Sequence, residues 1–267
     1  MLADSHCHIH EPDYDLPAEG VLKAAAEANV RRIITLSGEM SDLQLALDYA
    51  KRYHDSYGLK VYACLGVHPQ EASNLPDDFI GQIRRLIESN RDVVCGVGEI
   101  GLDYYYDFAS HELQIKALKA QLELAHELNL PVSMHIRSGD GGNAFDDLMA
   151  TLEQLPFKIH GVVHSFTDTT ESLYRVLNYG LYVGVNGIAT FNKDPELAAA
   201  YDQMPLERIL LETDSPWLTP KPYRGQTNQP ARIKDIAAAI AARRGLTLDE
   251  VAKQTTSNTI ALYDLAP

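Results

Sequence analysis

The chain has 267 residues, with 23 Lys or Arg against 37 Asp or Glu, so its formal net charge is −14 at pH 7. Such a surface repels polyanions and argues against a protein that coats DNA, although metal ions could supply local positive charge for binding a strand end. No apolar run reaches ~18 residues, no signal peptide is recognisable and the three cysteines fit reduced thiols, so we expect a cytoplasmic protein with no membrane contact.

Strand-like and helical segments alternate along the whole chain. Apolar, β-rich runs predict eight strands, over residues 1–9, 32–36, 60–67, 93–99, 131–136, 160–166, 181–185 and 208–212. Helical patterns fall between them, over residues 18–29, 41–54, 77–90, 110–128, 143–155, 169–179 and 194–203. Near the end, Thr247 and Glu250 predict a capping box that opens a last helix.

Strands that alternate with helices indicate a parallel sheet. Eight such units in a chain close to ~250 residues favour a closed (β/α)₈ TIM barrel, and no linker or low-complexity tract divides the sequence. We therefore expect an α/β protein with a single domain over residues 1–267. A doubly wound open sheet is the alternative, but it would normally need fewer strands and a ligand at a switch point.

Side chains of the kind that bind metals end five of the eight predicted strands. They are His6 with His8, Glu99, His135, His164 and Asp214. The carboxyl ends of barrel strands meet at one face, where such enzymes carry out their chemistry, so we expect these six residues to share one pocket. His6 and His8 point the same way because strand side chains alternate, whereas Cys7 points toward the helices. The alternatives are hydrogen-bonded core histidines and an ion-paired Glu99.

Other polar residues nearby have weaker signals. His10 lies beyond the first strand, and His160 lies near the start of its strand, which favours a structural role. Glu212 shares a face with Asp214, so the two acids could divide into metal ligand and proton acceptor. Ser165 lacks a nucleophile elbow. The stretch GVGEIGLDYYY matches a dinucleotide fingerprint literally, but no helix opens at its last glycine and its glutamate would repel pyrophosphate.

The chain resembles the TatD family of metal-dependent deoxyribonucleases. The resemblance rests on these segments in this order: DSHCHIH, GVHP, GVGEIGLDYY, LPVSMHIR, VVHSF, LLETDSPWL and PKPYRGQTNQP. In the last segment Arg224, Gly225 and Asn228 fall on the family pattern R-G-x-x-N-x-P, and the similarity extends to the N-T-x-x-L-Y pattern at residues 258–263.

The resemblance implies a TIM barrel of the amidohydrolase type with two divalent metal ions. His6, His8 and Asp214 would hold the first ion, Glu99 would bridge, and His135 and His164 would hold the second. It also implies cytoplasmic hydrolysis of nucleic-acid phosphodiester bonds, often from a 3′ end, so single-stranded DNA or nucleic-acid ends are the expected substrates. Zinc, manganese or magnesium could serve, and no obligate protein partner is evident.

We therefore predict Asp214 and Glu99 as the catalytic residues, with Asp214 accepting a proton from the attacking water. The predicted substrate-binding residues are His68, Arg137, Arg224 and Asn228. Tyr104, Tyr105 and Tyr106 could stack a terminal base or pack their loop. Two alternatives remain open: a metal-dependent hydrolase of an ester or amide, such as D-aminoacyl-tRNA or a cyclic amide, and a non-catalytic metal-binding protein.

Overall fold

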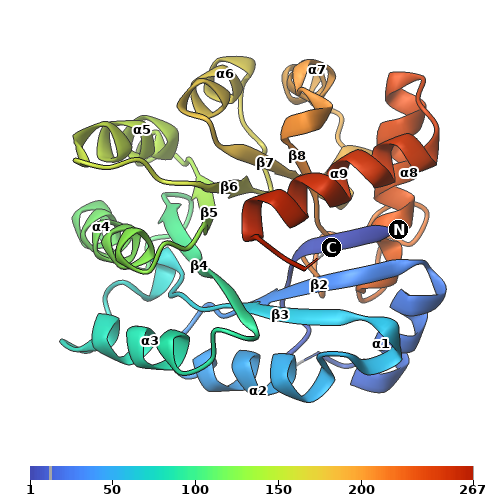
Figure 1. Ribbon diagram of the computed structural model, residues 1–267. Helices are drawn as coiled ribbons and strands as arrows, with labels where there is room; N and C mark the ends of the chain where they lie inside the picture. The colour runs from blue at the N-terminus through green and yellow to red at the C-terminus, as the bar shows by residue number, and fades with distance from the viewer. Residues whose placement is uncertain (12–13, 267) are drawn as a thin grey trace.

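Eight parallel strands form the centre of the computed structural model, which describes residues 1–11 and 14–266 (Figure 1). Their bounds are β1 Leu2–Cys7, β2 Val30–Leu36, β3 Lys60–Cys64, β4 Val94–Asp103, β5 Val132–Arg137, β6 Gly161–His164, β7 Tyr182–Val185 and β8 Ile209–Leu211. Each strand pairs with the next in chain order, which confirms the eight predicted strands and excludes the reordered sheet of a doubly wound fold. Residues 12, 13 and 267 of the predicted single domain lie outside the described residues.

The last strand meets the first, so the sheet closes into a barrel. The main-chain N–H of Asp214, just after β8, donates to the carbonyl oxygen of His6 at 2.9 Å. The main-chain N–H of His8 donates in return to the carbonyl oxygen of Ser215 at 2.7 Å. These two bonds join the carboxyl ends of β1 and β8, and the TIM-barrel prediction is confirmed.

Helices surround the barrel (Figure 1). The α-helices are α1 Ala18–Glu27, α2 Leu43–Tyr53, α3 Phe79–Glu88, α4 His111–Glu127, α5 Ala144–Gln154, α6 Thr170–Tyr179, α7 Pro195–Gln203, α8 Ile233–Arg244 and α9 Leu248–Tyr263. Short 3₁₀ helices are η1 Ser56–Gly58, η2 Pro69–Glu71, η3 Gly187–Thr190, η4 Leu206–Arg208 and η5 Pro230–Arg232. The predicted capping box opens α9, where the side chains of Thr247 and Glu250 each accept a bond from the other's main chain.

The ends of the other strands differ from the predicted ones by at most three residues, and two larger features differ from the sequence-based expectation. Residues 233–244, where no helix is predicted, form α8, in which Ile233, Ile236 and Ile240 recur at helical spacing and are buried. Strand β4 continues to Asp103, four residues beyond its predicted end at Glu99. Two glycines interrupt the apolar pattern around Glu99, so the pattern alone did not show that the strand continues.

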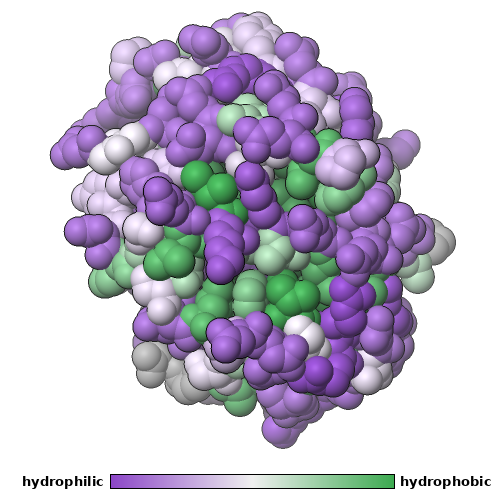
Figure 2. Space-filling view, turned by 90° about the vertical axis from the view of Figure 1, so that its left-hand side faces the viewer, coloured by the Kyte–Doolittle hydropathy of each residue, from purple (hydrophilic) through white to green (hydrophobic). Residues whose placement is uncertain are grey.

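The buried core has two main parts. The larger one lies between the strands and the surrounding helices, and it includes Cys7. A smaller one includes Cys64 and Cys95 together with Tyr263 from the end of α9, so α9 contributes to the packing inside the barrel. On the face shown in Figure 2, hydrophobic residues gather near the middle and hydrophilic ones surround them. Among the described helices, none is long and apolar enough to cross a membrane.

Strand register brings polar residues of neighbouring strands to the same level. His135 on β5 pairs with His164 on β6, and Gly101 on β4 pairs with His135. Between Val97 and Ile100 the register of β4 shifts, and Glu99 lies within this irregular stretch. Gly101 has φ +144°, and a Cβ atom there would lie 1.9 Å from the carbonyl oxygen of His135. A glycine therefore permits the close approach of β4 to β5.

Candidate metal centre

The side chain of Glu99 lies between two pairs of histidines. Its Oε2 atom is 3.4 Å from Nε2 of His6 and 3.3 Å from Nε2 of His8. Its Oε1 atom is 3.0 Å from Nδ1 of His135 and 2.8 Å from Nε2 of His164. Each carboxylate oxygen thus faces a different pair of imidazole nitrogens.

Asp214 completes the first set of donor atoms. Its Oδ1 atom is 3.7 Å from Nε2 of His6 and 3.6 Å from Nε2 of His8. The two Nε2 atoms themselves are 3.1 Å apart. Carboxylate oxygens from β4 and from the segment after β8 therefore both lie close to the two imidazole nitrogens at the end of β1, as expected when the strand ends of a barrel meet.

The spacing of these donors fits a bound cation. Nitrogen and oxygen ligands about 2.0–2.2 Å from a tetrahedral zinc ion lie about 3.3–3.6 Å from each other. The Nε2 atoms of His6 and His8 are 3.1 Å apart, and each lies 3.3 to 3.7 Å from Oε2 of Glu99 and from Oδ1 of Asp214. Buried polar groups are normally paired, and a cation would satisfy two imidazole nitrogens that face one another. The described residues therefore form a buried His and Glu cluster that can hold metal ions.

The opposite ring nitrogens of the first pair are held in place. Nδ1 of His8 lies 2.8 Å from the carbonyl oxygen of Leu36. A carbonyl can only accept, so this Nδ1 carries a proton and the ring is fixed with Nε2 facing Glu99. Burial opposes protonation of His8, yet Glu99 and Asp214 raise its pKa to about 9. Nδ1 of His6 lies 3.2 Å from the hydroxyl of Ser133, which can accept in the same way. Both rings are thereby fixed with Nε2 facing Glu99.

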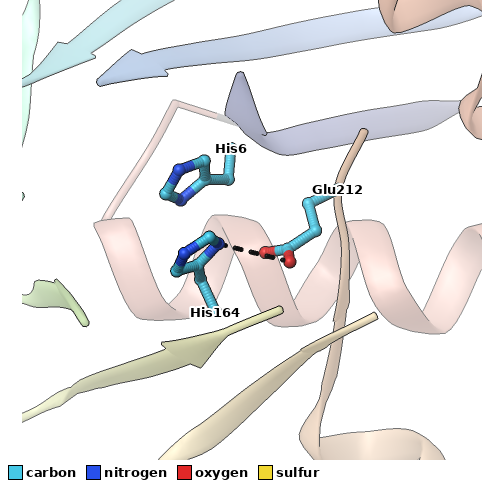
Figure 3. A group of neighbouring side chains, drawn as sticks. All are labelled: His6, His164 and Glu212. Carbon is cyan, nitrogen blue, oxygen red and sulfur yellow. Dashed lines mark ion pairs between the residues drawn. The ribbon is translucent and has the colours of Figure 1, made fainter. Parts of the chain in front are cut away.

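Two buried carboxylates face the second pair. Oδ2 of Asp103 is 3.2 Å from Nε2 of His135. Oε1 of Glu212 is 3.6 Å from Nδ1 of His164, and Figure 3 shows this ion pair with the ring of His6 beside that of His164. The rings of His6 and His164 stack with their centroids 3.8 Å apart. Glu212 therefore faces Nδ1 of His164, whereas Glu99 faces Nε2 on the other side of the same ring.

Two aspartates that support the cluster, Asp103 and Asp4, were not predicted as site residues from the sequence. Asp103 went unnoticed because β4 was expected to end at Glu99, although an acid near a strand end was the available signal. Its carboxylate also accepts from Nε2 of Gln70 at 2.9 Å. Asp4 is fully buried and accepts from the main-chain N–H and the hydroxyl of Thr213, at 2.9 and 2.6 Å. Asp4 thus ties β1 to the residue that precedes Asp214.

Charges within the cluster set its protonation. Burial by itself would raise the pKa of Glu99, but His164 and His6 hold that pKa well below its usual value. Burial, and then His164, hold the pKa of His6 well below its usual value. Burial opposes protonation of His164, yet Glu99 and Glu212 keep its pKa well above the usual value. Glu99 is therefore ionised and His6 neutral, which are the forms that bind metal ions, whereas a protonated His164 would have to release its proton on binding one.

A cavity of about 970 Å³ opens over the cluster and is lined by His8, Glu99, His135, His164 and Asp214 among others. His68 lines it too, with Nε2 3.7 Å from Oε1 of Glu99. Nδ1 of His68 accepts from the main-chain N–H of Gln70, so Nε2 of the neutral ring carries a proton toward the cavity. Burial and then His135 lower the pKa of His68 to about 3, which keeps this ring neutral.

The other predicted substrate residues occupy different places. Arg137 lines the cavity, and its guanidinium carbon lies 3.8 Å from the ring centroid of Tyr105. Among the described residues that line the cavity, Arg224 and Asn228 do not occur. Arg224 lies over the ring of Phe191 and donates to the carbonyl oxygen of Thr219. Asn228 is buried and supports the segment after β8, donating to the carbonyl oxygens of Thr213 and Trp217.

The tyrosines after β4, the two remaining histidines and the glycines of the literal fingerprint each have a defined position in the structure. Tyr104 is buried and stacks on His111 at 3.5 Å, so it packs its loop, whereas Tyr106 lines the cavity. His10 is buried against Thr35, and His160 is exposed just before β6. All three glycines of the literal fingerprint, Gly96, Gly98 and Gly101, lie within β4. No helix opens there, which confirms that the stretch is not a dinucleotide-binding turn.

Comparison with known proteins gives the family. The model for TatD-related DNases matches residues 3–264. The uncharacterized metal-dependent hydrolase YabD of Bacillus subtilis is 31% identical over 264 residues, 98% of this chain and 99% of that protein. The 3′-5′ ssDNA/RNA exonuclease TatD of Erwinia amylovora is 36% identical over 251 residues, 92% of this chain and 93% of that protein.

A solved structure agrees with these relatives. The TatD homologue YJJV of Escherichia coli K12 superposes with a TM-score of 0.89 at 31% identity, covering 99% of this chain and 98% of the other. The fold, the buried histidine and glutamate cluster and the relatives lead to the same conclusion. This chain belongs to the TatD-related DNase family and is a metal-dependent hydrolase on a barrel of the amidohydrolase type.

Proposed function

We propose that this protein hydrolyses phosphodiester bonds at the 3′ ends of single-stranded nucleic acid, using two divalent cations bridged by Glu99. The observation that carries the proposal is the division of the Glu99 carboxylate, whose two oxygens face separate pairs of imidazoles. His6, His8 and Asp214 would hold one cation. His135 and His164 would hold the other. When bound, the two cations would lower the pKa of an attacking water and neutralise charge on the phosphoryl oxygens.

The chain's own residues then have distinct tasks. Asp214 accepts the proton of the attacking water at its carboxylate, which lies beside the first donor set. The Nε2–H of His68 points into the cavity and donates to a phosphate oxygen. Arg137, the cationic side chain that lines the described cavity, pairs with a second phosphate oxygen. Together these groups orient the phosphodiester for attack.

Exposed aromatic side chains at the mouth support a substrate with bases. Tyr106 and Phe108 follow β4, Trp217 follows β8, and all three line the cavity. Their exposed fractions are 44%, 62% and 50%, so their rings are open to solvent rather than packed in the core. Unpaired bases stack on aromatic side chains whatever their sequence, which suits single-stranded substrates.

The test begins with the metal. The protein is dialysed against EDTA, its metal content is measured by elemental analysis, and zinc, manganese or magnesium is restored in turn. Each sample is then given single-stranded DNA labelled at the 5′ end. The proposal predicts a ladder of products shortened from the 3′ end, with activity lost in EDTA and regained with metal. The Asp214→Asn variant serves as the inactive control.

A substrate panel separates the proposal from its alternatives. It contains the labelled DNA, a D-aminoacyl-tRNA and a cyclic amide, each tested with the same metal-loaded protein. A metal-dependent barrel could in principle cleave any of the three. Turnover of the ester or amide without shortening of the DNA would refute the nuclease proposal and leave the hydrolase class intact.

A further inference from the structure

Carboxylates gather on one side of the cavity mouth. Glu11 follows β1, Glu39 and Asp42 follow β2, and Glu71 follows β3, and all four line the cavity. We call these four residues the acidic arc. Because β1, β2 and β3 are consecutive in the barrel, their carboxyl-terminal loops form a continuous third of the rim.

The opposite side of the mouth has a different character. Apart from the histidine ligands, the described cavity residues from β5 to β7 and their following loops are Ile136, Arg137, Ser165, Thr167 and Ile188. This set contains a cation and no carboxylate. In a closed barrel of eight strands, β5 to β7 lie across the axis from β1 to β3. The aromatic residues after β4 and β8 separate the two sides.

Contacts within the acidic arc leave its charge largely intact. Glu39 accepts from the hydroxyl of Ser41 at 2.8 Å, and Glu71 accepts from the amide of Asn74 at 3.3 Å. Asp42 accepts from the main-chain N–H groups of Gly38 and Glu39. The donors to Glu39 and Glu71 are neutral, so they orient these carboxylates without cancelling their charge. Glu11 lies 3.8 Å from Nδ1 of His8 and Asp42 lies 3.5 Å from Nε2 of His10, so Glu39 and Glu71 carry most of the unpaired charge. The arc therefore faces the cavity as a cluster of negative groups.

We infer that the acidic arc is the element that restricts this site to strand ends. The inference rests on the proposed function, since it concerns how a nucleic acid enters that site. A strand that continued past the scissile bond on the β1 to β3 side would bring its next phosphate against Glu39 and Glu71. Like charges repel, and no Lys or Arg among the described residues that line the cavity on this side offsets the charge of Glu39 and Glu71. The nucleic-acid strand instead leaves the cavity past Arg137, and its terminal nucleotide lies on the side of the acidic arc.

The experiment compares a linear single-stranded DNA with a covalently closed circle of the same sequence. The Glu39→Gln/Glu71→Gln variant removes two charges of the arc and leaves every predicted metal ligand in place. The wild type is expected to shorten the linear strand and spare the circle. The variant is expected to raise the ratio of circle cleavage to linear cleavage about tenfold, within the range by which local charge alters nucleic-acid encounter.

Two matched variants isolate the cause. Glu39→Asp/Glu71→Asp keeps both charges and should keep the wild-type ratio. Glu27→Gln/Glu153→Gln changes the net charge equally at exposed positions near the ends of α1 and α5 and should also keep it. An increase with this last pair equal to that of the arc variant would overturn the inference, because net charge would then explain the effect.

Other outcomes are equally decisive. Equal cleavage of circle and linear strand by the wild type would overturn the inference while supporting the nuclease proposal. An arc variant with the wild-type ratio would overturn it as well. Failure of the metal-loaded wild type to cleave the linear strand would refute the proposed function itself, and the inference with it.

Discussion

The main-chain N–H of Asp214 donates to the carbonyl oxygen of His6 at 2.9 Å, which joins residues near opposite ends of the chain. Asp214 has φ +55°, a left-handed conformation that is uncommon outside glycine. Its neighbour Thr213 is held by Asp4, and Ser215 accepts from His8. Bonds from β1 thus fix the backbone on both sides of Asp214, and they aim its carboxylate at the two N-terminal imidazoles.

Replacing Asp214 with asparagine should separate catalysis from metal binding. The amide keeps the shape of the side chain and the main-chain bond to His6, but it cannot accept a proton. We expect Asp214→Asn to retain most of its metal and to lose about 10²–10⁴-fold in kcat. Elemental analysis and single-strand cleavage measure the two effects, with Asp140→Asn, an exposed acid, as control. A rate near that of the wild type would exclude Asp214 as proton acceptor.

Removal of the Glu99 carboxylate should empty at least one metal position. Oε1 and Oε2 face different histidine pairs, so the Glu99→Ala variant removes a donor from both sets. We expect metal content to fall by at least one ion per chain and cleavage to be lost. The control is Glu123→Ala, which alters an exposed acid on α4. Unchanged occupancy in the Glu99 variant would rule out the bridge.

Glu212 should control the ring of His164. A carboxylate beside Nδ1 favours the proton there and leaves Nε2 free for a cation. In Glu212→Gln the amide can donate to Nδ1 instead and shift the ring proton to Nε2. We expect the weaker metal site to lose about 10–100-fold in affinity, measured by titration against a chelating indicator. The control is Glu207→Gln, which alters an acid outside the cavity. If Glu212→Gln bound metal as tightly as the wild type, Glu212 would have no role in orienting His164.

Gly101 should tolerate no side chain. Its φ of +144° and the 1.9 Å approach of a Cβ atom to the carbonyl oxygen of His135 leave no room for alanine. We expect Gly101→Ala to lower the free energy of unfolding by more than about 3 kcal/mol, measured by urea denaturation. Gly20→Ala is the matched control, because nothing lies within 4 Å of a Cβ atom there. Equal midpoints for the two variants would contradict the packing argument.

Asp4 should make stability depend on pH. Burial raises the pKa of Asp4 to about 8, so the fold favours its protonated form. The stability of the fold therefore carries no penalty from Asp4 below about pH 3.9, the pKa of an aspartate in the unfolded chain. The free energy of unfolding then falls as the pH rises from there through about 8. Asp4→Asn, which cannot ionise, should therefore gain stability relative to the wild type between pH 6 and pH 9. Thermal unfolding in EDTA measures the difference, and a gap that is constant with pH would contradict it.

The local pattern of apolar residues predicted much of the barrel, because buried strands and amphipathic helices have different periodicities and alternate along the sequence. The exceptions are informative. Helix α8 has three isoleucines at helical spacing, but alanines occupy most of its other positions and blurred the pattern. Strand β4 was cut short at Glu99 because glycines on either side of it resemble a turn, and Asp103 was overlooked for the same reason.

The sequence by itself determined which residue types end the strands and that His6 and His8 share a face, since both follow from the two-residue period of a strand. Only the tertiary structure decided how the Glu99 carboxylate divides between two histidine pairs and that Arg224 lies on Phe191 rather than in the cavity. It alone decided that the acids after β1 to β3 line the same cavity as Arg137. These relationships depend on distances between strands that meet when the barrel closes, and no local pattern encodes such distances.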